Sequence, residues 1–328
     1  ASNCSNFGGE GFFSDLSGSW NNASNNVGGD SCSSPDLFAP CNTIFGSPGP
    51  TNMPSSLLGY QYSRTGTRHA GIITYEALSE YREYIQGHTS VPLTSGQTYC
   101  VSMYVSLGDD VAFATDNMGV YFSNTEYMRD PCPGGQNSGI YETPQLNHDC
   151  AVITDTVNWV RLQWDYTASG GEQYFVIGNF FTNGNTSVTN TGGGLLNPYA
   201  YYFIDDVSIV AETCCFADVE QPDVHCVDDP SFNLIATGGT GSNCSSTVDA
   251  TWSGTGITNI SSGTFDPATA GVGVHPITVT LDCGYSTTTN VIVSACANLS
   301  LCLETNGDLT VSGGTGPYTR NEQALVQD

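Results

Sequence analysis

A carboxylate between apolar residues is the first feature of this sequence that could do chemistry. Side chains alternate between faces in an extended chain, so Asp205 shares a face with Phe203, Val207 and Ile209. A charge on a buried face must be paired, hydrogen-bonded or bound to a metal ion. Two roles therefore stay open for Asp205: it accepts hydrogen bonds from backbone amides at a strand end, or it binds a cation.

Acidic residues dominate the charge of the chain. Its 32 Asp and Glu residues oppose six basic residues, all of them Arg, and the net charge is -26. Nucleic acids and anionic membrane surfaces bind clustered Lys and Arg, so both classes of partner are excluded. An acidic surface favours cations, above all Ca²⁺, which prefers carboxylate and carbonyl oxygens. The plain alternative is that the charge only keeps the chain soluble.

Familiar catalytic motifs are absent from the sequence. It contains no G-x-S-x-G nucleophile elbow, no H-E-x-x-H zinc motif and no phosphate-binding P-loop, and its five His are dispersed. Glu80 and Glu83 could form the carboxylate pair of a glycosidase, but so acidic a chain offers such pairs by chance. We therefore expect a protein that is not an enzyme.

The thirteen cysteines indicate disulfides. None are spaced C-x-x-C or combined with His at zinc-finger spacing, so an oxidising compartment explains them better than metal or redox chemistry. Because the number is odd, at least one thiol is free or pairs outside this chain. Short-loop closure, and loops expected at one end of the second β unit, give the candidate pairs Cys32–Cys41, Cys132–Cys150 and Cys244–Cys283.

Most of the sequence has the alternating apolar residues that are typical of β-strands. Apolar residues alternate from Val160 to Tyr166, which puts Leu162 and Trp164 on one buried face. Many short runs of this kind, separated by Gly, Asn and Pro, predict a β-sandwich or jelly roll over residues 1–212. No apolar run is long enough to span a membrane.

A second β unit is predicted over residues 213–297. Apolar residues alternate again at Ile277, Val279 and Leu281, and Gly-rich turns separate such runs, as in an immunoglobulin-like sandwich. Residues 298–328 hold about two strands, too few for a stable sheet in water. This tail is therefore expected to be a partial repeat or a strand-donating segment.

Several short motifs follow one another along the chain. In the first unit they are Gly59-Tyr60-Gln61, Arg82-Glu83-Tyr84-Ile85, Ile153-Thr154-Asp155-Thr156, Ile177-Gly178-Asn179-Phe180 and Tyr202-Phe203-Ile204-Asp205-Asp206-Val207. In the second unit they are Trp252-Ser253-Gly254, Phe265-Asp266-Pro267 and His275-Pro276-Ile277-Thr278. In these residues the chain resembles large secreted proteins of Bacteroidota, of the gliding-motility-associated, type IX-secreted kind. The resemblance implies a jelly roll similar to carbohydrate-binding modules, then an immunoglobulin- or PKD-like sandwich, then a partial β unit.

The resemblance also implies sites. Related jelly-roll modules hold a structural Ca²⁺ with an Asp at this place and an acid near the first strand, so Glu10, Asp205 and Asp206 are the expected ligands of the only expected cofactor. Asp155-Thr156-Val157 is similar to the O-glycosylation pattern of Bacteroidota, with a structural role as the alternative. The glycosylation candidates are Thr156 and, within N-x-S/T sequons, Asn22, Asn185 and Asn259.

Together these features predict a secreted, extracellular protein whose signal peptide was removed before Ala1. The first hypothesis is a non-catalytic subunit or segment of a bacterial surface filament or adhesin. It would assemble head to tail with copies of itself, by β-strand donation from the tail. The alternative is a glycan-binding module on a stalk of repeats. Aromatic residues could supply a sugar platform, although Trp159, Trp164 and Trp252 lie in patterns typical of a core.

Overall fold

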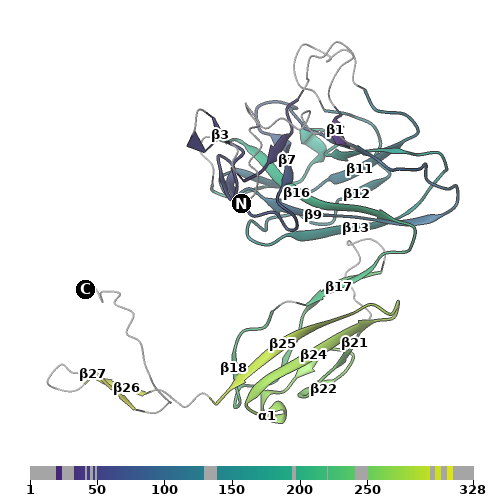
Figure 1. The fold of residues 1–328 in the computed structure, drawn as a ribbon. Coiled ribbons are helices and arrows are strands. Elements are labelled where there is room, and N and C mark those ends of the chain that lie inside the picture. Colours follow the sequence, from purple (N-terminus) through teal and green to yellow (C-terminus); the bar gives the residue numbers. More distant parts are fainter. Residues whose placement is uncertain are drawn as a thin grey trace. The chain divides into compact units, whose positions relative to one another are not determined.

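The regular secondary structure of the computed structural model is almost wholly β-strand (Figure 1). It describes residues 20–23, 33–40, 43–44, 47–48, 50–128, 139–193, 197–219, 221–240 and 250–295, and the backbone of 300–303 and 309–312. Contacts divide the chain into two compact units. Unit 1 comprises residues 1–215 and 239–247, and unit 2 comprises residues 216–238 and 248–328. The predicted all-β class is confirmed.

Unit 1 contains two five-stranded antiparallel sheets. In spatial order, the β9 sheet is formed by β13 (Val160–Thr167), β9 (Thr98–Leu107), β16 (Tyr199–Val210), β7 (His69–Glu76) and β2 (Asp36–Phe38). The β8 sheet is formed by β1 (Trp20–Asn22), β8 (Ile85–His88), β14 (Tyr174–Gly178), β11 (Met118–Ser123) and β12 (Leu146–His148). Apart from β11 and β12, neighbouring strands in both sheets are not consecutive among the strands of the chain, although short strand pairs account for part of the separation of β2 and β7.

Short elements complete unit 1. They are the strand pairs β3 (Thr43–Ile44) with β4 (Ser47–Pro48), β5 (Ser55–Ser56) with β6 (Gly59–Tyr60) and β10 (Phe113–Thr115) with β15 (Val188–Asn190), and the 3-10 helix η3 (Asn183–Asn185). Among the described residues, no helix has the length and apolar character that a membrane span needs.

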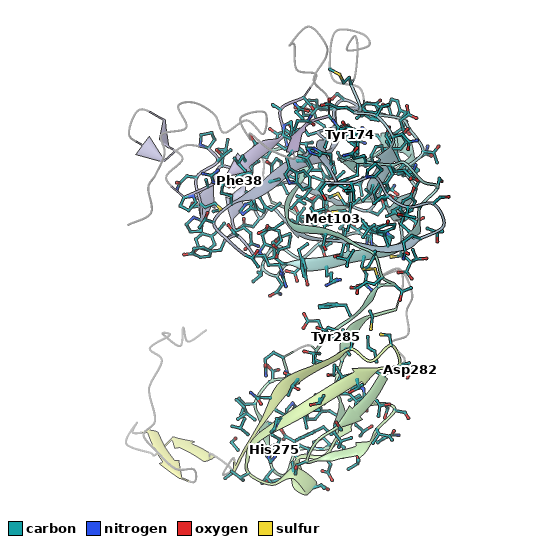
Figure 2. The ribbon with its side chains drawn as sticks, turned by 45° about the vertical axis from the view of Figure 1, so that its right-hand side comes forward. Phe38, Met103, Tyr174, His275, Asp282 and Tyr285 are labelled. Carbon is teal, nitrogen blue, oxygen red and sulfur yellow. A yellow bond between two sulfur atoms is a disulfide. The ribbon has the colours of Figure 1, made fainter. Side chains whose placement is uncertain are left out.

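The core of unit 1 lies where the alternation of β13 predicts it. Leu162, Trp164 and Tyr166 are buried, and the half-buried Val160 packs against the same cluster. Met103 of β9, which is 1% exposed, belongs to it as well (Figure 2). Burying one such side chain contributes about 1.5–3 kcal/mol, so this cluster is the main force that holds the sandwich together.

Unit 2 is a smaller β-sandwich. Its four-stranded sheet has the order β18 (His225–Cys226), β25 (Ser286–Ser294), β24 (Gly273–Leu281) and β21 (Ala250–Ser253). Its three-stranded sheet has the order β19 (Phe232–Asn233), β23 (Thr264–Phe265) and β22 (Ile257–Asn259), followed in the chain by α1 (Pro267–Ala270). The alternating residues Ile277, Val279 and Leu281 are all buried, as their spacing predicts.

Two further strand pairs involve the ends of unit 2. β17 (Cys215–Val219) pairs with β20 (Ala236–Thr240), and the division between the units falls within both strands. β26 (Ser300–Leu303) pairs with β27 (Leu309–Ser312), and within the described part of the chain this hairpin pairs with no other strand.

Candidate functional site

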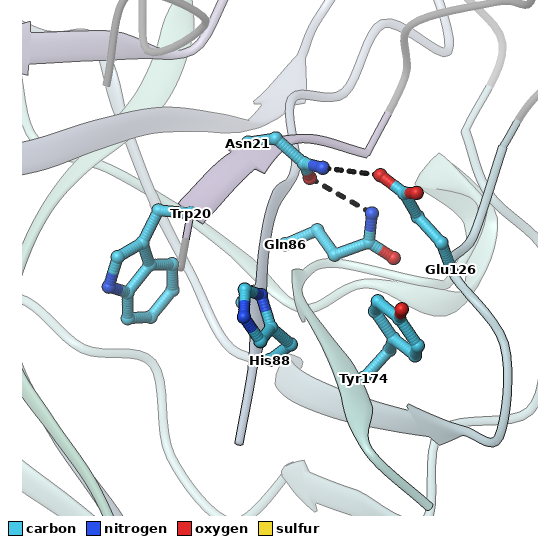
Figure 3. A pocket seen from close by; sticks show the side chains of 7 residues that line it. Trp20, Asn21, Gln86, His88, Glu126 and Tyr174 are labelled. Carbon is cyan, nitrogen blue, oxygen red and sulfur yellow. Dashed lines mark hydrogen bonds between the residues drawn. The ribbon is translucent and has the colours of Figure 1, made fainter. Parts of the chain in front are cut away.

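A polar pocket lies on the outer face of the β8 sheet (Figure 3). In β8, Ile85 is buried in the core between the sheets, so Gln86 and His88 project from the opposite face. Cross-strand pairing places Asn21 beside Gln86 and Tyr174 beside His88, on that same face. The pocket has a volume of about 210 Å³ and is lined by Trp20, Asn21, Gln86, Gly87, His88, Glu126 and Tyr174.

A chain of hydrogen bonds orders the polar side of this pocket. The backbone N–H of Tyr127 donates to Gln86 Oε1 at 2.7 Å, and Gln86 Nε2 donates to the carbonyl oxygen of Tyr127 at 3.3 Å. Gln86 Nε2 also donates to Asn21 Oδ1 at 2.9 Å. Asn21 Nδ2 in turn donates to Glu126 Oε1 at 2.6 Å. Gln86 is 1% exposed, so a buried amide holds this row of polar groups in place.

Two aromatic rings form the other side. The rings of His88 and Tyr174 lie 6.0 Å apart on the outer face. Trp20 also borders the pocket, but it pairs with Gly87, and its ring packs edge-on against the core residue Phe175 on the inner face, with ring centroids 5.3 Å apart. Aromatic rings beside planar amides and a carboxylate can bind a ligand that has both C–H faces and hydroxyl groups, such as a sugar.

A glycine makes the packing below the pocket possible. A Cβ on Gly87 would lie 2.4 Å from Cζ of Phe175, closer than real contacts allow. Gly87 pairs with Trp20 on one side and with Phe175 on the other, so the absence of a side chain lets the two rings meet across β8. The glycine thereby lets the two rings pack on the inner face of the sheet, beneath the pocket.

A second, small apolar cluster covers the neighbouring part of the same sheet face. It consists of Ala23, Tyr84, Ile140, Val176 and Phe180, all of them buried. Tyr84 Oη donates to the carbonyl oxygen of Asn179 at 2.6 Å and accepts from the N–H of Ile140 at 2.8 Å. The outer face of the β8 sheet is therefore part covered and part open, and the pocket lies in the open part.

Asp205 does not lie on the face that simple alternation predicts. It pairs with Tyr104, whereas Ile209 pairs with Val101, three residues away on β9 and therefore on the opposite face. The cause is a β-bulge between Asp205 and Ser208, where Asp206 has a positive φ of 49°. The expected shared face of Asp205, Val207 and Ile209 was wrong, because the extra residue reverses the alternation.

Hydrogen-bond donors surround both acids of this bulge. Asp205 Oδ2 accepts from the N–H groups of Arg64, at 2.8 Å, and Thr65, at 3.3 Å, and Asp205 Oδ1 accepts from the N–H of Asp206 at 2.8 Å. Asp206 accepts from the Arg64 guanidinium and the Thr65 hydroxyl. Burial raises the pKa of Asp205. The first of the two predicted roles, acceptance from backbone amides, is the one that Asp205 has.

The described surroundings of these two acids are those of hydrogen-bonded carboxylates. The groups that face the two carboxylates are N–H and O–H donors rather than oxygen ligands. No group of three or more His, Cys, Asp or Glu that could hold a metal occurs among the described residues. Glu10, the third expected ligand, lies outside the described residues, so the calcium prediction stays untested.

Asp205→Ala is expected to destabilise unit 1 by about 1–3 kcal/mol, because three backbone N–H groups lose their acceptor. Urea denaturation in buffer with EDTA measures this loss in the absence of calcium. A loss that appears only when calcium is added would instead assign Asp205 to a metal site.

Glu80 and Glu83 do not form a catalytic pair in this structure. Glu80 Oε2 accepts from the N–H of Asn183 at 2.9 Å, while Glu83, which is 2% exposed, accepts from the N–H of Ile73 at 2.8 Å and from Tyr81 Oη at 2.7 Å. Each carboxylate thus fixes a different segment of backbone. Burial raises the pKa of Glu83 to about 8, and the nearby charge of Asp36 adds to this rise.

This buried acid predicts how stability depends on pH. Because the folded pKa is about 8 and the unfolded one about 4.5, the stabilising contribution is complete below pH 4.5 and is lost as the pH rises through 8. The free energy of unfolding of unit 1 should fall by roughly 1–3 kcal/mol between about pH 6 and pH 9. Urea denaturation across this range measures the fall. In Glu83→Gln it should be much smaller, and a slope as steep as in the wild type would contradict the assignment.

One long-range disulfide was not predicted from the sequence. Cys100 of β9 is bonded to Cys214, and 114 residues separate the two in the chain. Spacing favours short loops, so it gave no sign of this bond. Cys150 and Cys283 are disulfide-bonded, as are Cys215 and Cys226. The pairings of Cys150 with Cys132 and of Cys283 with Cys244 stay predictions, because Cys32, Cys41, Cys132 and Cys244 lie outside the described residues.

The glycosylation candidates differ in accessibility. Asn22 is 6% exposed and its Nδ2 donates to the carbonyl oxygen of Ser33 at 2.6 Å, so this nitrogen is not available to a glycan in the folded protein. Asn185 and Asn259 are exposed and stay candidates. Thr156 is half-buried, and the carboxylate of the preceding Asp155 accepts from the N–H groups of Val157 and Asn158. That carboxylate has a structural role in this turn.

The residues of the pocket were not predicted. Trp164 and Trp252 are core residues, as their patterns indicate, but no role was predicted for Trp20. The one usable signal was the alternation of Gln86 and His88 with Ile85 and Gly87, which marks a strand with a polar outer face.

Comparisons with known proteins give fold likenesses only. No family model matches the chain, and no curated protein matches it. The CBM22-1 xylan-binding domain of Xyn10C from Paenibacillus barcinonensis is similar at 14% identity and a TM-score of 0.28, over 61% of this chain and 90% of that one. The K1 cleaved adhesin domain of Lys-gingipain from Porphyromonas gingivalis W83 is similar at 15% identity and a TM-score of 0.30, over 61% and 96%.

A third similar structure is the CBM22-1–GH10 part of a xylanase from Clostridium thermocellum, at 14% identity and a TM-score of 0.27. That match covers 45% of this chain and 23% of the xylanase chain, so the likeness leaves out most of the enzyme. These TM-scores are too low for a function to be carried over to this chain.

Proposed function

We propose that unit 1 is a non-catalytic glycan-binding module of an extracellular protein, and that the pocket on the outer face of the β8 sheet binds the sugar. The observation that carries this proposal is the pairing of ring surfaces from His88 and Tyr174 with the ordered amides of Asn21 and Gln86. The Cys100–Cys214 disulfide supports folding in an oxidising compartment.

The pocket suits a single sugar ring of a longer glycan. Its volume of about 210 Å³ is below the roughly 300–1,000 Å³ of pockets that enclose whole drug-sized ligands. A ring could pack against the aromatic side while its hydroxyl groups meet the polar side. The test is a glycan array probed with the full-length chain. Binding to a defined set of glycans supports the proposal, and an array without any binding would overturn it.

One observation favours a structural role as a second candidate. The β26–β27 hairpin is a sheet of only two strands, which needs a host to be stable. A segment that pairs with a neighbouring copy would assemble the chain into a surface filament. Deleting residues 299–328 should then abolish filaments while the two thermal unfolding transitions remain. Filaments that form without residues 299–328 would contradict assembly through this segment. Membership of the secreted Bacteroidota proteins stays a proposal that rests on the motifs quoted above.

A further inference from the structure

The direction of the hydrogen bonds in the pocket follows from one backbone contact. The N–H of Tyr127 can only donate, so the group of Gln86 that faces it must be the oxygen. The Gln86 amide nitrogen then faces Asn21, which must present its own oxygen. The Asn21 nitrogen is left to face Glu126, and this suits a carboxylate, which can only accept. All three side chains are thus oriented in one direction, and the row ends at a carboxylate.

This direction leaves an acceptor at the open end of the row. Glu126 is exposed, and its Oε1 already accepts from Asn21. No hydrogen bond to its other oxygen, Oε2, comes from any described residue. A ligand group that replaces water at this oxygen keeps the hydrogen bond only if it is a donor, which hydroxyl and ammonium groups are and a carboxylate or sulfate is not.

The charge around the pocket also disfavours acidic ligands. None of the residues that line it is Arg, and the chain as a whole has a net charge of -26. With the His88 imidazole neutral, an acidic sugar would bring a second negative charge to Glu126 without a cation to compensate it. Like charges brought together in an interface are a strong means of rejecting a ligand.

We infer that this pocket selects sugars without acid groups, by presenting the Glu126 carboxylate as a fixed hydrogen-bond acceptor. The inference rests on the proposed function and adds the class of ligand to it. Neutral sugars bind through their hydroxyl groups, amino sugars bind at least as well through an ammonium group, and uronic acids and sulfated sugars are rejected.

The full-length chain is tested on a glycan array that presents each sugar in a neutral, an amine-bearing and an acid-bearing form. Acid-bearing forms should bind at least about tenfold more weakly than their neutral counterparts. In Glu126→Gln, which can still accept from Asn21, this discrimination should fall below about threefold. Glu142→Gln removes the same charge from an exposed residue outside the pocket and should keep the discrimination.

The outcomes separate the two proposals. An array without any binding overturns the proposed function, and the inference with it. Acid-bearing glycans that bind as tightly as neutral ones overturn the inference alone. Equal loss of discrimination in Glu126→Gln and Glu142→Gln would also overturn it, because a general effect of net charge would then explain the selectivity.

Discussion

Replacing both cysteines of the Cys100–Cys214 disulfide by alanine is expected to lower the free energy of unfolding of unit 1 by about 3–5 kcal/mol. The bond closes a loop of 114 residues, and the cost of leaving so long a loop open in the unfolded chain is among the largest that one crosslink removes. Both cysteines are also buried, at 6% and 0% exposure, so their loss leaves a gap in the packing.

Thermal unfolding measures this effect, which corresponds to a drop of roughly 10 °C in the melting temperature of unit 1. Val279→Ala is the control, because Val279 is buried in the core of unit 2 and its loss should leave the transition of unit 1 in place. A decrease below about 1 kcal/mol in the double variant would show that this crosslink is not what stabilises the sandwich.

Tyr174→Ala is expected to weaken glycan binding by about 10- to 100-fold, since aromatic anchors of a binding site typically contribute ~2 kcal/mol or more. Tyr174 is half-buried and lines the pocket beside His88, so the substitution removes ring surface from the site. Affinity is measured by titration calorimetry with the strongest glycan of the array.

Tyr62→Ala is the matched control for this variant. Tyr62 is 60% exposed and does not line the pocket, so removing its ring takes away similar surface outside the proposed site. It should bind the glycan like the wild type. Equal affinity in Tyr174→Ala and the wild type, with both variants folded, would place the sugar elsewhere on the protein.

The parts of the fold that could be predicted are those set by local alternation. The buried face of β13 and the buried row of β24 both follow from a period of two residues. Asp205 is a residue for which alternation gives the wrong face. One bulge, marked by the positive φ of Asp206, moves the following residues to the other face, and no residue type in this segment requires it.

The pocket could not be predicted for a related reason. Trp20, Gln86 and Tyr174 come from three strands that pair in space but lie far apart in the chain, and Glu126 comes from a loop. Strand order decides which of these side chains meet, and alternation within each strand carries no information about that order. The Cys100–Cys214 bond was missed for the same reason, since spacing alone ranks nearby cysteines first.

The side-chain amide signals of Asn21 and Gln86 offer the most direct test of the central claim. Both amides line the pocket, whereas the amide of Asn179, which donates to the carbonyl oxygen of Thr74, is buried outside it. When a bound glycan is titrated into isotope-labelled protein, the signals of Asn21 and Gln86 should shift and the signal of Asn179 should stay in place. A glycan that binds without moving the Asn21 and Gln86 signals would contradict a sugar site on the outer face of the β8 sheet.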